Sequence, residues 1–183
     1  MLLIQTGLAG VFVVESQAVS DQRGFFMRLF CGNELESILA GRQIVQINQS
    51  ITKSVGAVRG MHIQNPPHAE MKFVRCLRGK AWDVAVDLRM DSPTFLKWYA
   101  VELTPGNSRM LVIPEGCAHG YQCLEENSEL LYLHTAPYTP AAEGGVPYND
   151  PKLDIRWPLP ATDVSVRDLA LLPIAPDFFG IKV

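Results

Sequence analysis

Histidine is the side chain best suited to acid–base chemistry near neutral pH, and this chain has four histidines. Two of them lie in sequences that suggest a site, His62 in the string VRGMHIQ and His119 in the string PEGCAHG. Because nearby cations favour the neutral form of an imidazole, Arg59 and Lys72 make His62 a candidate general base. An aspartate from elsewhere in the chain would hold the other ring nitrogen and stabilise the charged form. His119, taken alone, is more typical of a hydrogen-bonded barrel histidine.

Metal binding is a second chemistry that these histidines allow. The pattern PxGxxH, which ends at His119, is similar to the second motif of the cupin superfamily, a group of small double-sheet barrels. Cupins often bind a metal through a paired HxH, a glutamate and this later histidine. Here the first motif reads HIQ from His62, so the paired histidine is missing, and His68 lies beyond two prolines. A metal site of His62, His68 and His119 remains an alternative that this spacing disfavours.

Short strands must position these residues, because the dominant period of the sequence is two. In KAWDVAVDL (80–88), Trp82 and every second residue after it share one face, while Ala81 and Asp83 begin the other. Turn-rich segments separate further extended runs. These runs are VFVVE (11–15), RQIVQIN (42–48), MKFVRC (71–76), LKWYAVEL (96–103), RMLVIP (109–114) and ELLYLH (129–134). The pattern predicts an all-β, antiparallel sandwich or barrel.

Two segments depart from the strand pattern. GNELESILAG (32–41) predicts a helix that Asn33 caps. From about Pro137 the sequence is rich in proline and loses its period, but large apolar residues such as Trp157 argue against a disordered tail. We therefore expect one domain over 1–183, with a core barrel at about 43–135 and the segment 137–183 wrapped over it.

Composition excludes several classes of function. A chain of 183 residues has the length of one domain, and 48% apolar with 19% charged residues excludes a disordered, collagenous or coiled-coil protein. The net charge of -3 argues against a general nucleic-acid binder and against attachment to anionic lipid by charge alone. No apolar run approaches the ~20 residues of a membrane span. The four cysteines form no CxxC pair and lie among apolar neighbours, which is typical of reduced thiols in the cytoplasm.

Eight strings together resemble one family, the dTDP-4-dehydrorhamnose 3,5-epimerases. They run in the family's order and cover nearly the whole chain. The resemblance implies a cupin-type double-sheet antiparallel barrel, or jelly roll. The strings are DQRGFF (21–26), VQINQS (45–50), AVRGMHIQ (57–64), KFVRCLRGKAWDVAVDLRMDSPTF (72–95), RMLVIPEGCAHGYQ (109–122), LLYLHTAPYTP (130–140), YNDPKLDIRWPLP (148–160) and SVRD (165–168).

The resemblance also implies an isomerase activity. Members of this family remove a proton next to the C4 ketone of a nucleotide-linked 4-keto-6-deoxy sugar and return it to the opposite face, at C5 and C3. They use no metal and no organic cofactor, and they are dimers that exchange N-terminal strands. Such an inversion needs a base on one face, an acid on the other, and positive charge near the developing enolate oxygen. A nucleotide sugar and a second copy of the chain are thus the implied partners, with neither nucleic acid nor membrane.

Individual site residues follow from the same resemblance. His62 matches the family's base, Asp168 the aspartate that pairs with it, Tyr132 the tyrosine that donates a proton from the opposite face, and Lys72 a lysine near the sugar. Positions that match the family's ligand contacts are Arg23, Arg28, Gln46, Asn48, Arg59, His119, Tyr138, Glu143 and Arg167. Among them, Tyr138 matches an aromatic that stacks on thymine, and Arg23 is expected to serve the neighbouring subunit's site.

Structural roles remain open for several of these residues. Asp168 could cap a turn through Ser165, and Tyr132 could be an ordinary half-buried strand tyrosine. Lys72 and Arg75 alternate on a strand, so we expect one of them to face solvent. We also expect the fold to bring four distant cations into one locally positive pocket on an acidic protein. These cations are Arg23, Arg59, Lys72 and Arg167.

Departures from the family pattern bear on the substrate. Arg28 stands where rhamnose-pathway members usually carry glutamate, and Glu70 and Met71 change the family's AQGK to AEMK. Tyr132 is followed by Leu133 and His134, where a lysine is common, and the usual aromatic after His62 is absent. The sugar, the nucleobase and the number of inverted centres therefore stay open. Alternatives are a sugar-nucleotide 3,4-ketoisomerase, a metal-dependent cupin oxygenase and a non-catalytic sugar-nucleotide-binding protein.

Overall fold

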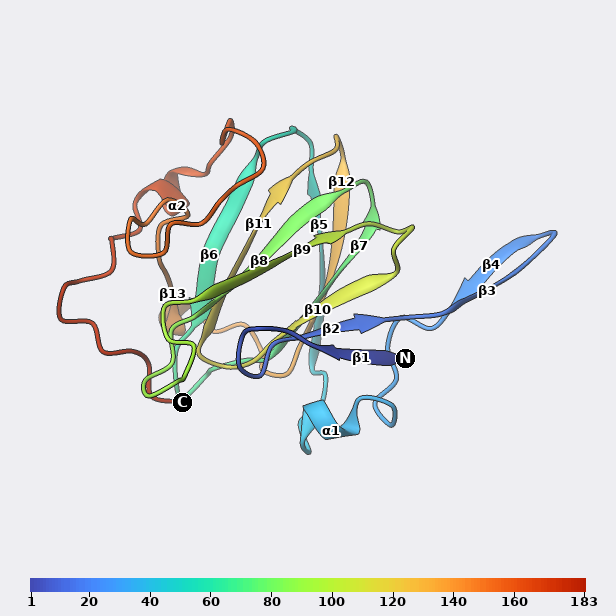
Figure 1. Ribbon diagram of the computed structural model, residues 1–183, viewed down its shortest axis with the longest axis horizontal. Helices are drawn as coiled ribbons and strands as arrows, with labels where there is room; N and C mark the ends of the chain where they lie inside the picture. The colour runs from blue at the N-terminus through green and yellow to red at the C-terminus, as the bar shows by residue number, and fades with distance from the viewer.

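Two antiparallel sheets face each other and form the body of the protein, which is described over residues 1–183 by a computed structural model (Figure 1). The six-stranded sheet has the order β1 (Leu2–Gln5), β2 (Phe12–Glu15), β10 (Arg109–Ile113), β7 (Lys72–Arg78), β12 (Ser128–His134) and β5 (Gln46–Thr52). The five-stranded sheet has the order β13 (Glu143–Gly145), β6 (Val58–Gln64), β11 (Cys117–Cys123), β8 (Ala81–Asp87) and β9 (Trp98–Leu103). This arrangement confirms the predicted all-β, double-sheet architecture.

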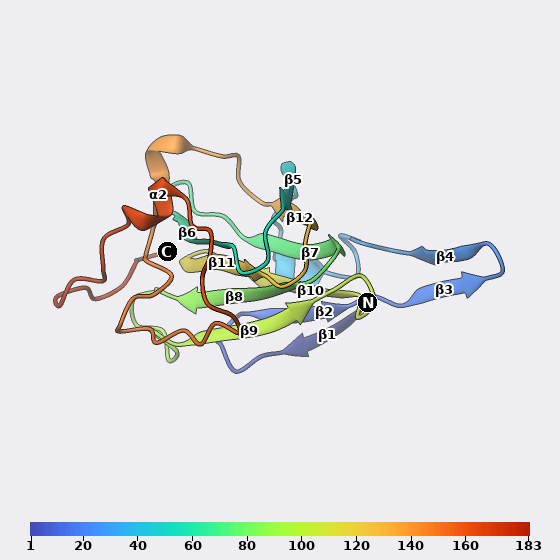
Figure 2. The same cartoon turned by 90° about the horizontal axis from the view of Figure 1, so that it is seen from above.

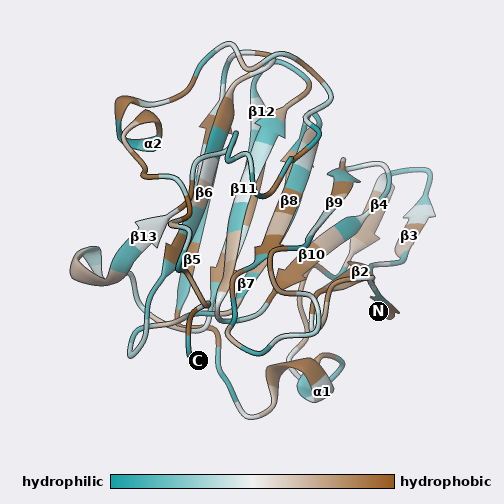
Figure 3. Ribbon diagram, turned by 60° about the vertical axis from the view of Figure 1, so that its left-hand side comes forward, coloured by the Kyte–Doolittle hydropathy of each residue, from teal (hydrophilic) through white to brown (hydrophobic).

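Strand β8 shows why the alternating pattern produces two buried faces. Ala81 and Ala85 join the core between the sheets, together with residues of β7 and β10. Val84 and Val86 pack on the other side, against residues of the C-terminal segment such as Ile155. Hydrophobic residues accordingly run along β8 and β10 in Figure 3. Both faces of the five-stranded sheet are therefore covered, which removes apolar surface from water on each.

The outer face of the six-stranded sheet is covered by the segment that contains α1 (Glu36–Leu39). Leu35, Ile38 and Leu39 are buried there against Phe73 of β7. The prediction that Asn33 caps this helix is wrong, because the helix is a single turn that begins after Leu35 without a side-chain cap. Burial of these three apolar side chains, rather than capping, fixes this turn.

Strand β5 lies later in the chain than the hydrophobic pattern indicated, since it begins at Gln46 and ends at Thr52. Its second half carries polar residues at alternate positions, Asn48, Ser50 and Thr52, whose side chains face a pocket rather than the core. Because this face is polar, the alternation of apolar residues predicts a strand that begins and ends too early in the chain. Ile44, which belongs to the predicted run, packs instead beside the helix that covers the outer face.

Two segments lie outside the facing sheets. A hairpin of β3 (Ala18–Asp21) and β4 (Gly24–Met27) projects away from the body in both orthogonal views (Figures 1 and 2). The C-terminal segment contains η1 (Pro140–Ala142), β13 and α2 (Val166–Leu169), and packs Leu153 and Ile174 against the five-stranded sheet. No helix of the structure has the length and hydropathy that a membrane-spanning helix requires.

Candidate active site

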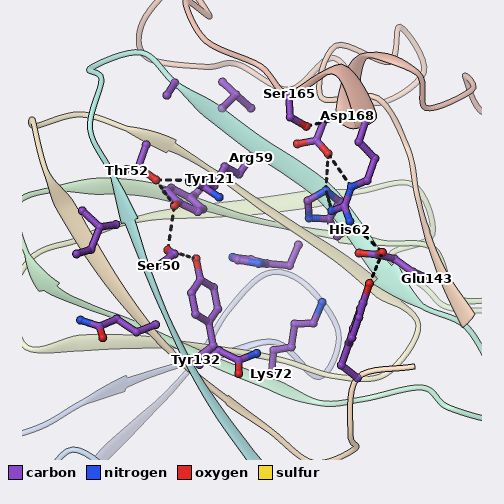
Figure 4. Close-up of a pocket in the computed structure, with 18 of the residues that line it drawn as sticks. Ser50, Thr52, Arg59, His62, Lys72, Tyr121, Tyr132, Glu143, Ser165 and Asp168 are labelled. Atoms are coloured by element: carbon purple, nitrogen blue, oxygen red, sulfur yellow. Dashed lines mark hydrogen bonds and ion pairs between the residues drawn. The ribbon is translucent and has the colours of Figure 1, made fainter. Parts of the chain in front are cut away.

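A pocket of about 850 Å³ is lined by residues from both sheets. The six-stranded sheet contributes β5, β7 and β12, the five-stranded sheet contributes β6, β11 and β13, and the C-terminal segment adds α2. The volume falls within the range of small-molecule sites, roughly 300–1,000 Å³. Figure 4 shows that the polar side chains of these elements converge on one space.

His62 and Asp168 form a hydrogen-bonded pair at this pocket. His62 Nε2 lies 2.7 Å from Asp168 Oδ1, although 106 positions separate the two residues in the chain. Asp168 is buried, and its second oxygen accepts the backbone N–H of Gly60 at 3.2 Å. Ser165 fixes this geometry, because its Oγ accepts the backbone N–H of Asp168 and caps α2. An ionised carboxylate only accepts hydrogen bonds, so Nε2 carries the proton and Nδ1 is the basic nitrogen of His62.

The surroundings of His62 favour its neutral form. Burial lowers the pKa of His62, and the positive charges of Arg167 and Lys72 lower it further, whereas Asp168 acts in the opposite direction. The guanidinium of Arg167 lies 3.1 Å from Nε2, where both groups are donors and the contact is one of charge and not a hydrogen bond, and it pairs with Glu143 at 3.0 Å. The sequence had indicated the effect of the cations, but burial is the larger cause. A neutral imidazole with a free Nδ1 can act as a general base at neutral pH.

Tyr132 reaches the pocket from β12, which lies in the other sheet. Its hydroxyl lies 2.9 Å from Ser50 Oγ. Burial raises the pKa of Tyr132 well above its usual value, so the phenol keeps its proton at neutral pH. A protonated phenol opposite a neutral imidazole supplies the acid and the base that act on two faces of a bound molecule.

A second polar cluster surrounds Lys72. Its ammonium lies 3.0 Å from Glu70 Oε1, and Glu70 Oε2 lies 2.7 Å from His134 Nδ1. Asn48 Nδ2 approaches the other ring nitrogen of His134 at 3.3 Å. Burial opposes ionisation of Glu70, but the hydrogen bond with His134 and the charge of Lys72 outweigh it, and the pKa of Glu70 lies below its usual value. The ammonium is therefore held in place by a carboxylate inside the pocket.

His119 lies in a similar pair. Its Nε2 is 2.7 Å from Asp83 Oδ1, and this aspartate is fully buried. His68 is exposed and does not line the pocket. The structure therefore does not bring His62, His68 and His119 together, and no three histidine, cysteine or carboxylate side chains gather in the geometry of a metal site.

The charges of the pocket are balanced. Four basic and four acidic side chains line it, namely Lys53, Arg59, Lys72, Arg167, Glu70, Glu143, Asp163 and Asp168. The expected gathering of four cations is thus observed for three of them, but carboxylates accompany them. Arg59 donates from Nε to the Thr52 hydroxyl at 3.0 Å and forms no ion pair, so the rest of its guanidinium is available to an anion.

Comparison with known proteins identifies the family. A model of the family described as dTDP-4-dehydrorhamnose 3,5-epimerase matches residues 5–175. The chain belongs to the dTDP-4-dehydrorhamnose 3,5-epimerase family. A relative from Salmonella typhimurium that carries this name is 40% identical over 173 residues, which are 93% of each chain.

Solved structures of family members have the same fold. The dTDP-6-deoxy-D-glucose-3,5-epimerase of Legionella pneumophila, in complex with dTDP-4-keto-L-rhamnose, has a TM-score of 0.91 and 34% identity, and the match covers 100% of this chain and 98% of that chain. A double mutant of a 3'-monoepimerase of Streptomyces bikiniensis, in complex with dTDP, has a TM-score of 0.83 and 29% identity, and the match covers 93% of this chain and 92% of that chain. The recognition of the family from sequence is thereby confirmed, and so is the cupin-type fold.

The structure brings most of the residues matched to the epimerase family into the pocket. Gln46 does not line it, but its Oε1 accepts the backbone N–H of Tyr138 at 2.9 Å. Arg23 and Arg28 lie apart from the pocket, where they pair with Asp21 and Glu34. The ten that line the pocket are Asn48, Arg59, His62, Lys72, His119, Tyr132, Tyr138, Glu143, Arg167 and Asp168.

The pocket residues that the resemblance did not single out include Ser50, Thr52, Glu70, Tyr121 and His134. The period of two on a strand could have indicated three of them, because Ser50 and Thr52 share a face with Asn48, and His134 shares one with Tyr132. Glu70 and His134 were noted only as departures from the family pattern.

The expectation that either Lys72 or Arg75 faces solvent is wrong. Neither side chain faces solvent, since Lys72 points into the pocket and Arg75 is 1% exposed. Arg75 donates to Ser16 Oγ at 2.7 Å and to the carbonyl of Ser108 at 3.1 Å, and burial lowers its pKa to about 10.

Proposed function

We propose that this protein is a dTDP-4-dehydrorhamnose 3,5-epimerase. It acts on a dTDP-linked 4-keto-6-deoxyhexose and inverts the carbons that flank the ketone, C5 and C3, in deoxysugar biosynthesis. The observation that carries the proposal is the placement of a neutral histidine and a protonated tyrosine on opposite sheets across one pocket. Family membership supports the substrate class, since a structurally similar member binds dTDP-4-keto-L-rhamnose.

The base in this reaction is Nδ1 of His62. It takes the proton from the carbon next to the C4 ketone, and the electron pair of the broken C–H bond delocalises onto the C4 oxygen. The imidazolium that forms is stabilised by Asp168, which already accepts its Nε2 proton. Positive charge on Lys72 stabilises the enolate oxygen, the part of the substrate where negative charge develops.

The acid is Tyr132, which donates its proton to the other face of the same carbon and so inverts it. Each inversion leaves His62 with an added proton and Tyr132 without one, and exchange with water restores both before the next. The substrate and the product have the same composition, so the reaction requires no oxidant or reductant. The same pair then acts at the second carbon after the sugar has turned in the pocket.

The nucleotide is held by the rim of the pocket. Arg59 and Arg167 supply charge for a diphosphate. Tyr138 is 53% exposed and its hydroxyl donates to Glu143 at 2.8 Å, so its ring is free to stack on thymine. The balanced charge of the pocket suits a ligand whose two phosphates occupy only part of the site.

A homodimer with exchanged N-terminal strands completes the proposal. The hairpin of β3 and β4 exposes Val19, Phe25 and Phe26 at 72%, 67% and 74%, and no part of the same chain covers it. The edge strand β5 exposes Ile47 and Ile51 as well. Exposed apolar patches of this kind mark interfaces. We place the dimer in the cytoplasm, which agrees with four cysteines that form no disulfide.

The deciding experiment is incubation with dTDP-4-keto-6-deoxyglucose in heavy water, with NMR observation of the ring protons. Exchange at both C3 and C5, with appearance of the L-sugar, supports a 3,5-epimerase. Exchange at one carbon only supports a monoepimerase, and migration of the ketone supports a ketoisomerase. A folded sample that exchanges neither proton contradicts the proposal. Elemental analysis of the same sample tests the oxygenase alternative, which requires stoichiometric metal.

A further inference from the structure

Three hydroxyl side chains form a continuous row between Arg59 and Tyr132. Arg59 Nε lies 3.0 Å from Thr52 Oγ1, which lies 2.6 Å from the hydroxyl of Tyr121. The Tyr121 hydroxyl lies 3.2 Å from Ser50 Oγ, which lies 2.9 Å from the hydroxyl of Tyr132. Figure 4 shows this hydroxyl row of Thr52, Tyr121 and Ser50 leading from the arginine to the tyrosine. None of the three has a role in the reaction described above.

The arginine at one end, together with the lack of other acceptors for the buried hydroxyls of Thr52 and Tyr121, sets one direction for the row. A guanidinium donates hydrogen bonds and accepts none, so Thr52 accepts from Arg59. The Thr52 hydroxyl has no acceptor other than Tyr121, so its proton points there, and the Tyr121 hydroxyl has then only Ser50 left to receive its own proton. Ser50 in turn donates to the oxygen of Tyr132. Since that oxygen accepts from the row, the proton of Tyr132 itself points away from the row and into the pocket.

Burial keeps water from replacing the hydrogen bonds of the row. Thr52 is 4% exposed and Tyr121 is 1% exposed, so neither hydroxyl can bond to bulk water in place of its neighbour in the row. A buried hydroxyl without a partner costs free energy, which makes the fully bonded arrangement the stable one. Burial raises the pKa of Tyr132, and the hydrogen bond from Ser50 acts in the opposite direction by stabilising its ionised form.

We propose that Thr52, Tyr121 and Ser50 are positioning residues that direct the proton of Tyr132 at the substrate and stabilise the tyrosinate left after its transfer. In that step the O–H bond of Tyr132 breaks, a C–H bond forms on the sugar, and the phenolate oxygen keeps its hydrogen bond from Ser50. Arg59 retains its proton throughout, so the row orients and stabilises without supplying a proton. This inference rests in part on the proposed epimerase function.

Two substitutions at Thr52 separate a hydrogen-bonding role from a packing role. Thr52→Val keeps the shape of the side chain but removes the hydroxyl, whereas Thr52→Ser keeps the hydroxyl and removes a methyl group. We expect Thr52→Val to lower the inversion rate about tenfold, which corresponds to about 1.4 kcal/mol and to the loss of one hydrogen bond. Proton exchange by His62 should stay within about twofold of the parent. Thr52→Ser should keep both rates, and Tyr121→Phe provides a second break in the row.

The opposite outcome overturns the inference. If Thr52→Val inverts the sugar as fast as the parent, or if Thr52→Ser is impaired and Thr52→Val is not, the hydroxyl has no directing role. Tyr148→Phe is the matched control, because it removes a tyrosine hydroxyl that lies outside the pocket. This control should change neither rate.

A measurement without substrate keeps this inference separate from the proposed function. In protein labelled with ¹³Cζ-tyrosine, the resonance that Tyr132→Phe deletes reports hydrogen bonding at the Tyr132 oxygen. We expect it to move in Thr52→Val and Tyr121→Phe but not in Thr52→Ser or Tyr148→Phe. That result supports the row even if the parent protein exchanges no proton of the dTDP sugar, in which case only the proposed function fails. A resonance that stays in place in Thr52→Val refutes the row whatever the activity.

Discussion

His62 and Tyr132 reach one pocket from different sheets, His62 from β6 of the five-stranded sheet and Tyr132 from β12 of the six-stranded sheet (Figure 4). A carbon held between them meets a base on one side and an acid on the other, which is the requirement for inversion. The double-sheet architecture therefore supplies the two opposed faces, and each side chain needs only to point inward from its own strand.

Removal of the base and of the acid should have different effects. His62→Ala should abolish both proton exchange and inversion, because no other group takes the proton. Tyr132→Phe should depress inversion by about 10²–10⁴-fold, the usual contribution of a general acid. Exchange should fall less, since His62 can return a solvent proton to the face from which it came. NMR of the sugar in heavy water measures both rates, and equal inversion by Tyr132→Phe and the parent would exclude Tyr132 as the acid.

The ionisation of His62 should respond in opposite directions to its two neighbours. Its pKa lies below the ordinary value of about 6.5, and the base is active when neutral, so the exchange rate should fall as the pH drops through that pKa. Arg167→Gln removes a positive charge and should raise the pKa of His62, which moves the acid limb of the pH profile upward. Asp168→Asn removes the carboxylate that stabilises the imidazolium and should lower the pKa of His62. NMR titration of the imidazole in free protein checks both directions, and a shift of the same sign in both variants would contradict them.

Lys72 should contribute to the transition state more than to binding. Lys72→Met removes the positive charge assigned to the enolate, and the loss of one such stabilising group typically lowers kcat about 10²–10³-fold. Lys80→Met is the matched control, because Lys80 pairs with Glu102 away from the pocket. Steady-state kinetics distinguish the roles, since a rise in KM with unchanged kcat would assign Lys72 to ground-state binding alone.

The sequence predicts those features that depend on local pattern. Alternation in β8 indicated both of its faces, because each face packs against apolar partners along the whole strand. The predicted cap at Asn33 is wrong because tertiary packing of the apolar side chains in this segment, and not a local capping bond, decides where the helical turn begins. Ser50 and Thr52 escaped notice because a polar strand face carries no hydrophobic signal. The pairing of His62 with Asp168 spans 106 positions, so only the resemblance to a family could suggest it.

Arg23 provides the sharpest test of the proposed dimer, because it lies in the projecting hairpin and not in the pocket of its own chain. If it serves the neighbouring subunit, Arg23→Ala and His62→Ala proteins are each impaired but complement each other when mixed. A mixed dimer then has one pocket with an intact His62 and an intact Arg23 from its neighbour. Random exchange of subunits makes half of the dimers mixed, and each mixed dimer has one intact site of two, so activity should return to about a quarter of the parent value.

Mixing after reversible unfolding provides the exchange, and the parent protein treated in the same way is the control. Failure of the mixture to exceed the average of the two variants would confine Arg23 to its own subunit.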